Sequence, residues 1–136
     1  MTPASRSNAA PNRIRPRQLH AAISVVVLGV LTAIALGVHD RWIRPHGGDL
    51  LVMIWLHHTW RSLWPRWSRW KVAGAALLLA LAVELGQLLR LLDRLGLEEI
   101  AALRVILGQT ADGVDVAMYV VGALIAALTD PDRTGE

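Results

Sequence analysis

The sequence contains no cysteine, which excludes both a disulfide framework and a thiolate metal site. It also lacks the short motifs of common enzyme classes. No nucleophile stands beside a base, no glycine-rich loop forms a phosphate cradle, and no histidine pair has metalloprotease spacing. There is no internal repeat. We therefore favour a protein that is not an enzyme, and we predict neither a cofactor nor a bound metal.

Charged residues are scarce in a chain dominated by apolar runs. Of the 136 residues, 54% are hydrophobic, and the mean hydropathy is +0.40. This is too apolar for an ordinary soluble domain of that size. The apolar residues form four blocks, at 19–38, 50–64, 72–92 and 111–128. The pattern predicts an all-α fold, a four-helix transmembrane bundle.

The two ends of the chain differ in composition from the apolar middle. Residues 1–17 are rich in Pro, Ser, Asn and Arg, which predicts a disordered basic cytoplasmic tail. Residues 18–130 form the predicted membrane domain, and 131–136 form a short cytoplasmic tail. A basic start followed by an apolar run also fits a cleaved signal peptide. However, a run of about twenty residues exceeds the usual signal core, so we interpret it as a retained helix.

Basic residues are distributed asymmetrically between the connectors. Arginines precede the first block, and arginines with Lys71 surround the second connector, whereas the third connector is net acidic. Positive charge collects on the cytoplasmic side, so both termini should be cytoplasmic. We do not expect nucleic acid as a partner. The basic residues beside the second connector alternate with Trp60, Trp64, Trp67 and Trp70, which indicates an interfacial belt or a site for anionic lipid headgroups.

Three local features refine this picture. Gly29, Ala33 and Gly37 form a small-residue stripe on the first helix, which favours close approach of another helix. His57 and His58 lie within the second block, where we favour a packed or interface-facing role over proton relay or metal ligation. The segment 97–107 is too short to span, so it predicts an interfacial or re-entrant helix before the last span.

Polar residues share a face with small residues on the third helix. At about 100° per residue, Ala76, Ala80, Glu84 and Gln87 align, with Arg90 at the edge. A charged group in hydrocarbon is costly, so Glu84 should face the bundle interior or a wet cavity. Arg90 should be the main charge partner of the carboxylates.

The last helix has a matching face, formed by Asp112, Asp115, Tyr119, Gly122 and Ala126. Both faces carry polar residues toward the outer end and small residues further in, so the two helices should meet along them. We predict one connected polar cluster in the outer half of the bundle, closed on the cytoplasmic side by the small residues.

The order of these motifs resembles a known family. The motifs are E-x-x-Q at Glu84 and Gln87, L-G at Leu107 and Gly108, D-x-x-x-Y-x-x-G from Asp115 to Gly122, and G-D-L at Gly48 to Leu50. The chain resembles the VanZ-like membrane proteins, and most of all their small relative, domain of unknown function 2809. This resemblance implies a four-helix protein of the bacterial cytoplasmic (inner) membrane, associated with the cell envelope and glycopeptide tolerance, without a settled reaction.

The candidate ligand-binding residues are Asp49, Glu84, Gln87, Arg90, Arg104, Asp112, Asp115 and Tyr119. Several have structural alternatives: Asp49 and Asp112 could cap helices, Arg104 could be interfacial, and the rest could lock the bundle. The favoured function is an outward-facing pocket for a lipid headgroup or small solute. The alternatives are a small oligomeric transporter or proton-coupled permease, and an intramembrane enzyme acting on a lipid-linked substrate. Expected partners are membrane lipids, such a ligand, and further copies of the chain.

Overall fold

The computed structural model describes residues 15–40, 42–97, 99–100 and 113–131. Over these ranges the elements are α1 (Pro16–Gly37), α2 (Ile43–Leu63), α3 (Arg69–Leu88), α4 (Leu91–Leu95) and α6 (Gly113–Thr129). The predicted all-α class is confirmed. The short helix predicted at 97–107 falls mostly outside the described residues.

Two of these helices, α1 and α3, are long and apolar enough to cross a membrane, and α6 is apolar but shorter, with 17 residues. Large apolar side chains remain exposed on both candidate spans: Val25 is 71% exposed, Leu36 77% and Leu78 69%. Exposed apolar faces of this extent are costly in water and favourable in lipid. A membrane location therefore has support from helix length and surface composition.

The second helix begins earlier than the sequence suggested. The Asp40 carboxylate accepts hydrogen bonds from the backbone N–H groups of Trp42 and Ile43, both at 2.8 Å. The bonds from Ile43 and Trp42 hold the pKa of Asp40 below its usual value. Pro45 is the third residue of α2, where a missing N–H costs no helical bond. Pro45 and the pair Gly47–Gly48 predict a helix break before Asp49. This prediction is wrong, because α2 continues through both glycines.

The third helix ends earlier than predicted, at Leu88. Arg90 adopts a left-handed conformation, with φ of 52°, and the chain then turns into the short helix α4. The predicted helical register therefore does not extend to Arg90.

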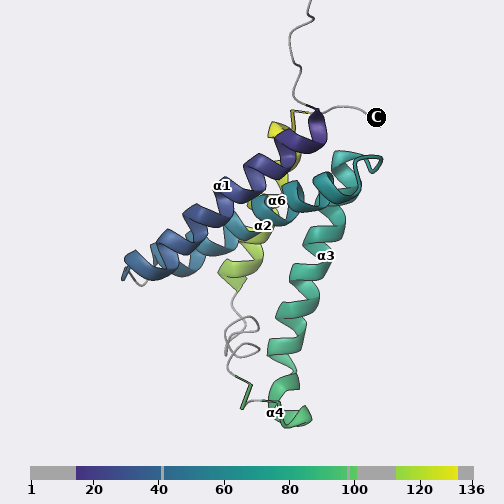
Figure 1. Cartoon of the computed structure of the whole chain (residues 1–136). Coiled ribbons are helices and arrows are strands. Elements are labelled where there is room, and N and C mark those ends of the chain that lie inside the picture. Colours follow the sequence, from purple (N-terminus) through teal and green to yellow (C-terminus); the bar gives the residue numbers. More distant parts are fainter. Residues whose placement is uncertain (1–14, 41, 98, 101–112, 132–136) are drawn as a thin grey trace, which may run out of the picture.

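Helices α2, α3 and α6 pack against one another, and α1 lies along α2. Figure 1 shows α1 and α2 side by side, with α3 running away from this pair toward α4. α1 presents His20 and Ser24 to α2. The small stripe on α1 does not mediate this contact: a side chain added at Gly29 or Gly37 would meet nothing within 4 Å among the described residues.

The core is built mainly from small residues. Its buried members are Met53, Ala73, Ala76, Ala80, Tyr119, Ala123 and Ala127. Gly122 permits the closest approach, because a Cβ added there would lie 2.6 Å from the Leu50 carbonyl oxygen of α2. The small residues predicted to close the bundle, Ala76, Ala80, Gly122 and Ala126, are all buried.

Candidate functional site

A cluster of polar side chains lies where the N-terminal part of α2 meets α3 and α6. We call His46, Asp49, Glu84, Asp115 and Tyr119 the acidic cluster. His46 and Asp49 are three residues apart on α2, and Asp115 and Tyr119 are four apart on α6. Each pair therefore occupies one helical face.

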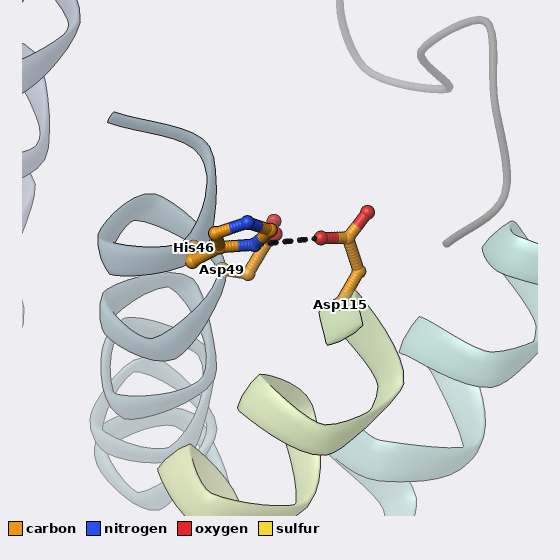
Figure 2. A group of neighbouring side chains, drawn as sticks. All are labelled: His46, Asp49 and Asp115. Atoms are coloured by element: carbon orange, nitrogen blue, oxygen red, sulfur yellow. Dashed lines mark hydrogen bonds and ion pairs between the residues drawn. The ribbon is translucent and has the colours of Figure 1, made fainter. Parts of the chain in front are cut away.

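The acidic cluster is joined by contacts between helices. His46 Nδ1 lies 3.2 Å from Asp115 Oδ1, and the Tyr119 hydroxyl donates to Asp49 Oδ1 at 3.5 Å. Figure 2 shows the His46 ring and the Asp49 carboxylate on α2 facing Asp115 across the gap to α6. Both contacts link α2 to α6, so the packing of these two helices sets the distances between the polar groups.

Glu84 joins this cluster from α3. Its side chain is buried, at 7% exposure, and it interacts electrostatically with both Asp49 and Tyr119. Asp49 interacts in addition with Asp115 and His46. Among the described residues, Asp49 thus interacts with two other carboxylates and one imidazole.

The close contact at Gly122 sets the geometry of the cluster. Gly122 lies on the same face of α6 as Asp115 and Tyr119, and it lets that face touch Leu50 and Met53 of α2. Asp49 immediately precedes Leu50. A larger residue at 122 would separate the carboxylates that the cluster brings together.

A cleft of about 1000 Å³ opens beside the acidic cluster. Its polar lining is His39, Asp40, Arg44, Asp49 and Tyr119, and its apolar lining includes Val52, Trp55, Leu56, Leu79 and Val83. Most apolar residues come from the facing sides of α2 and α3. The cleft therefore has an apolar wall and a polar end that carries both signs of charge.

The predicted candidate residues divide into those that meet and those that do not. Asp49, Glu84, Asp115 and Tyr119 come together, as the helical faces predicted. Because α2 starts at Ile43, Asp49 is inside the helix and does not cap it. Gln87 is partly buried one turn beyond Glu84.

Arg90 is not the charge partner of the cluster, contrary to prediction. Its side chain is 80% exposed, and its Nε lies 2.8 Å from Asp93 Oδ2. The early end of α3 and the left-handed backbone at Arg90 turn it away. Arg104 and Asp112 lie outside the described residues.

His46 is the member that sequence reasoning missed. Its spacing of three from Asp49 was a usable signal, because such residues share a face whenever the segment is helical. The signal was lost because the Pro-His-Gly-Gly segment was interpreted as a helix break.

A second buried polar group lies at the opposite end of α2. We call His20, His57, His58, Arg61 and Asp130 the histidine cluster. Asp130 Oδ2 accepts from His57 Nε2 at 2.8 Å and from Arg61 Nε at 2.9 Å, and Asp130 Oδ1 lies 3.5 Å from His20 Nε2. His20 Nδ1 lies 2.9 Å from His58 Nδ1.

This histidine cluster corrects one expectation. Arg61 is one of the basic residues beside the second connector for which the sequence predicts an interfacial position. It is instead fully buried, with Nη1 also donating to the carbonyls of Pro65 and Trp67. A buried arginine needs a carboxylate, and Asp130 supplies it. His57 and His58 are packed, as predicted, within a charged network.

Comparison with known proteins gives one family match. The model described as "Protein of unknown function (DUF2809)" matches residues 38–123, more than half of the chain. No curated protein and no solved structure matches. The matched segment contains the whole acidic cluster.

Proposed function

The chain belongs to the DUF2809 family of proteins of unknown function, and from that premise we propose that it is an integral membrane protein whose cleft binds the headgroup of a cell-envelope lipid. The single observation that carries this proposal is the amphipathic cleft beside the acidic cluster. The predicted link to VanZ-like proteins and the four-span bundle in the bacterial inner membrane are part of the same proposal.

The composition of the cleft matches an amphiphile. Val52, Leu79 and Val83 offer an apolar wall for an acyl chain. At the polar end, Arg44 can pair with a phosphate oxygen, and Asp40 or Asp49 can accept from an ammonium group. A zwitterionic phospholipid headgroup presents both of these charges. We therefore favour lipid over a small solute without an apolar tail.

Native mass spectrometry of the full chain, released gently from bacterial membranes, tests this proposal. We expect retained phospholipid in the parent protein and less in Arg44→Gln. The matched control is Arg94→Gln, which removes the same charge from an exposed position on α4. Equal lipid retention by the two variants would contradict the role of the polar end.

A second pair of variants tests the apolar wall. Val83→Trp should narrow the cleft and reduce lipid retention, whereas Leu78→Trp adds the same ring on an exposed part of α3. If both variants retain lipid like the parent, bound lipid is held on the outer surface of the protein instead.

The proposed orientation places the acidic cluster toward the outside. The observation behind it is the excess of arginine at the N-terminus and around the second connector. Reporter fusions at both ends should therefore give cytoplasmic signals. A periplasmic C-terminus would contradict both the four-span arrangement and the outward orientation of the cleft.

A proton-coupled permease is the second candidate, and the histidine cluster favours it. His20 and His58 face each other through their Nδ1 atoms, so one proton can be shared between them. Proteoliposomes with a trapped pH-sensitive dye would report proton movement. Movement that persists unchanged in His58→Gln would contradict this candidate.

A further inference from the structure

Three potential metal ligands of the acidic cluster lie close together. One ligand atom each from His46, Asp49 and Asp115 falls within 4.8 Å of the others. Figure 2 shows the two carboxylates and the imidazole directed toward a common space between α2 and α6. All three residues are partly buried, so solvent has only partial access.

The spacing suits a single small cation. Nitrogen and carboxylate oxygen bind Zn²⁺ at about 2.0–2.2 Å, which separates neighbouring tetrahedral ligand atoms by about 3.3–3.6 Å. His46 Nδ1 and Asp115 Oδ1 are 3.2 Å apart, close to this range. The third ligand atom, on Asp49, lies within 4.8 Å of the other two, so it must approach them to bind the same ion.

The charges of the proposed ligands favour a cation. Asp49 interacts with the Asp115 carboxylate and with one imidazole, His46. Like charges held at this proximity repel, and a divalent ion would offset two of them at once.

The hydrogen bonds and helices around the proposed ligands are those expected of a metal site. Tyr119 donates its hydroxyl to Asp49, as outer partners of carboxylate ligands do. The ligands are carried by two helices, and the close contact at Gly122 holds these helices together. Ligands fixed on regular elements lose little freedom when an ion binds.

We propose that His46, Asp49 and Asp115 bind one divalent transition-metal ion, with Mn²⁺ and Zn²⁺ fitting the mixed nitrogen and oxygen ligands. Three protein ligands leave coordination positions open. Asp49 and Tyr119 also line the cleft, so the metal site adjoins the space assigned above to a headgroup; with the ion on Asp49, Asp40 is the carboxylate that accepts from the ammonium group. Metal binding itself does not depend on lipid binding.

Metal titration of the full chain in detergent, after EDTA treatment, tests this site. Mn²⁺ binding is monitored through the loss of the free-ion EPR signal, and Co²⁺ binding is monitored through its visible absorption. We expect saturable binding in the parent and at least a 10-fold loss of affinity in Asp115→Asn and in His46→Gln. The matched control, Asp93→Asn, removes an exposed carboxylate on α4 and should bind like the parent.

Further measurements separate metal binding from folding and from the lipid proposal. Thermal unfolding without metal should be similar for the parent and Asp115→Asn, and added Mn²⁺ should raise the melting temperature of the parent alone. Val83→Trp should keep parental Mn²⁺ affinity while losing lipid. Equal Mn²⁺ affinity in the parent and Asp115→Asn would overturn the metal site, even where lipid retention is intact.

Discussion

The contact at Gly122 gives a sharp prediction about how α2 and α6 are held together. In Gly122→Ala, the new Cβ would lie 2.6 Å from the Leu50 carbonyl oxygen and 2.8 Å from Met53 Cβ. Real Cβ contacts essentially never fall below 3.0 Å, so the helices must move apart by several tenths of an ångström. The nearest atoms belong to backbone and to a Cβ, which cannot rotate away. Overpacking of this kind costs about 1–3 kcal/mol.

The measurement is the free energy of unfolding in mixed detergent micelles, compared with a matched control. Gly29→Ala makes the same chemical change on α1, where an added Cβ meets nothing within 4 Å of the described residues. It should cause no loss, because alanine favours helix more than glycine does. Since the separation also moves Asp49 from Asp115, Gly122→Ala should weaken Mn²⁺ binding too. Equal unfolding energies for the two variants would refute the close contact.

Two further predictions concern the other charged groups. Asp130→Asn should lower the free energy of unfolding by about 3–5 kcal/mol, because it leaves the charge of Arg61 buried without its carboxylate. Replacing both Arg61 and Asp130 by leucine should cost less than the sum of the two single leucine replacements. A strictly additive result would refute the coupling. Arg90→Leu should change it by less than about 1 kcal/mol, since the pair with Asp93 is exposed, and a loss as large as that of Glu84→Leu would restore Arg90 as the partner of the cluster.

Periodicity along single helices predicted the acidic cluster well. Glu84 with Ala76 and Ala80, and Asp115 with Tyr119, follow the helical repeat. The polar residues stand near the C-terminal end of α3 and near the N-terminal ends of α2 and α6, so they meet because α3 runs opposite to the other two helices. This reasoning needs only spacing and topology, and both were visible in the sequence.

The remaining features depend on helix ends and on the rotation of one helix against another. His46 belongs to the cluster because α2 begins at Ile43, where the Asp40 carboxylate accepts from the backbone N–H groups of Trp42 and Ile43. Composition does not reveal this early start. Arg90 left it because α3 ends at Leu88. Asp130 and Arg61 meet through the relative rotation of α2 and α6, which spacing along one chain does not specify.

The contact between His20 and Asp130 has a consequence for the connectivity of the chain. His20 lies in the second turn of α1, and Asp130 directly follows α6, so their 3.5 Å contact brings the two ends of the helical region together. In Figure 1 the start of α1 and the end of α6 lie at the same end of the molecule. A short linker could therefore join these ends, with new termini opened between Val38 and His39, after α1 and before α2. Such a circular permutant should keep the same helix contacts, because the fold depends on which helices meet and not on where the chain begins.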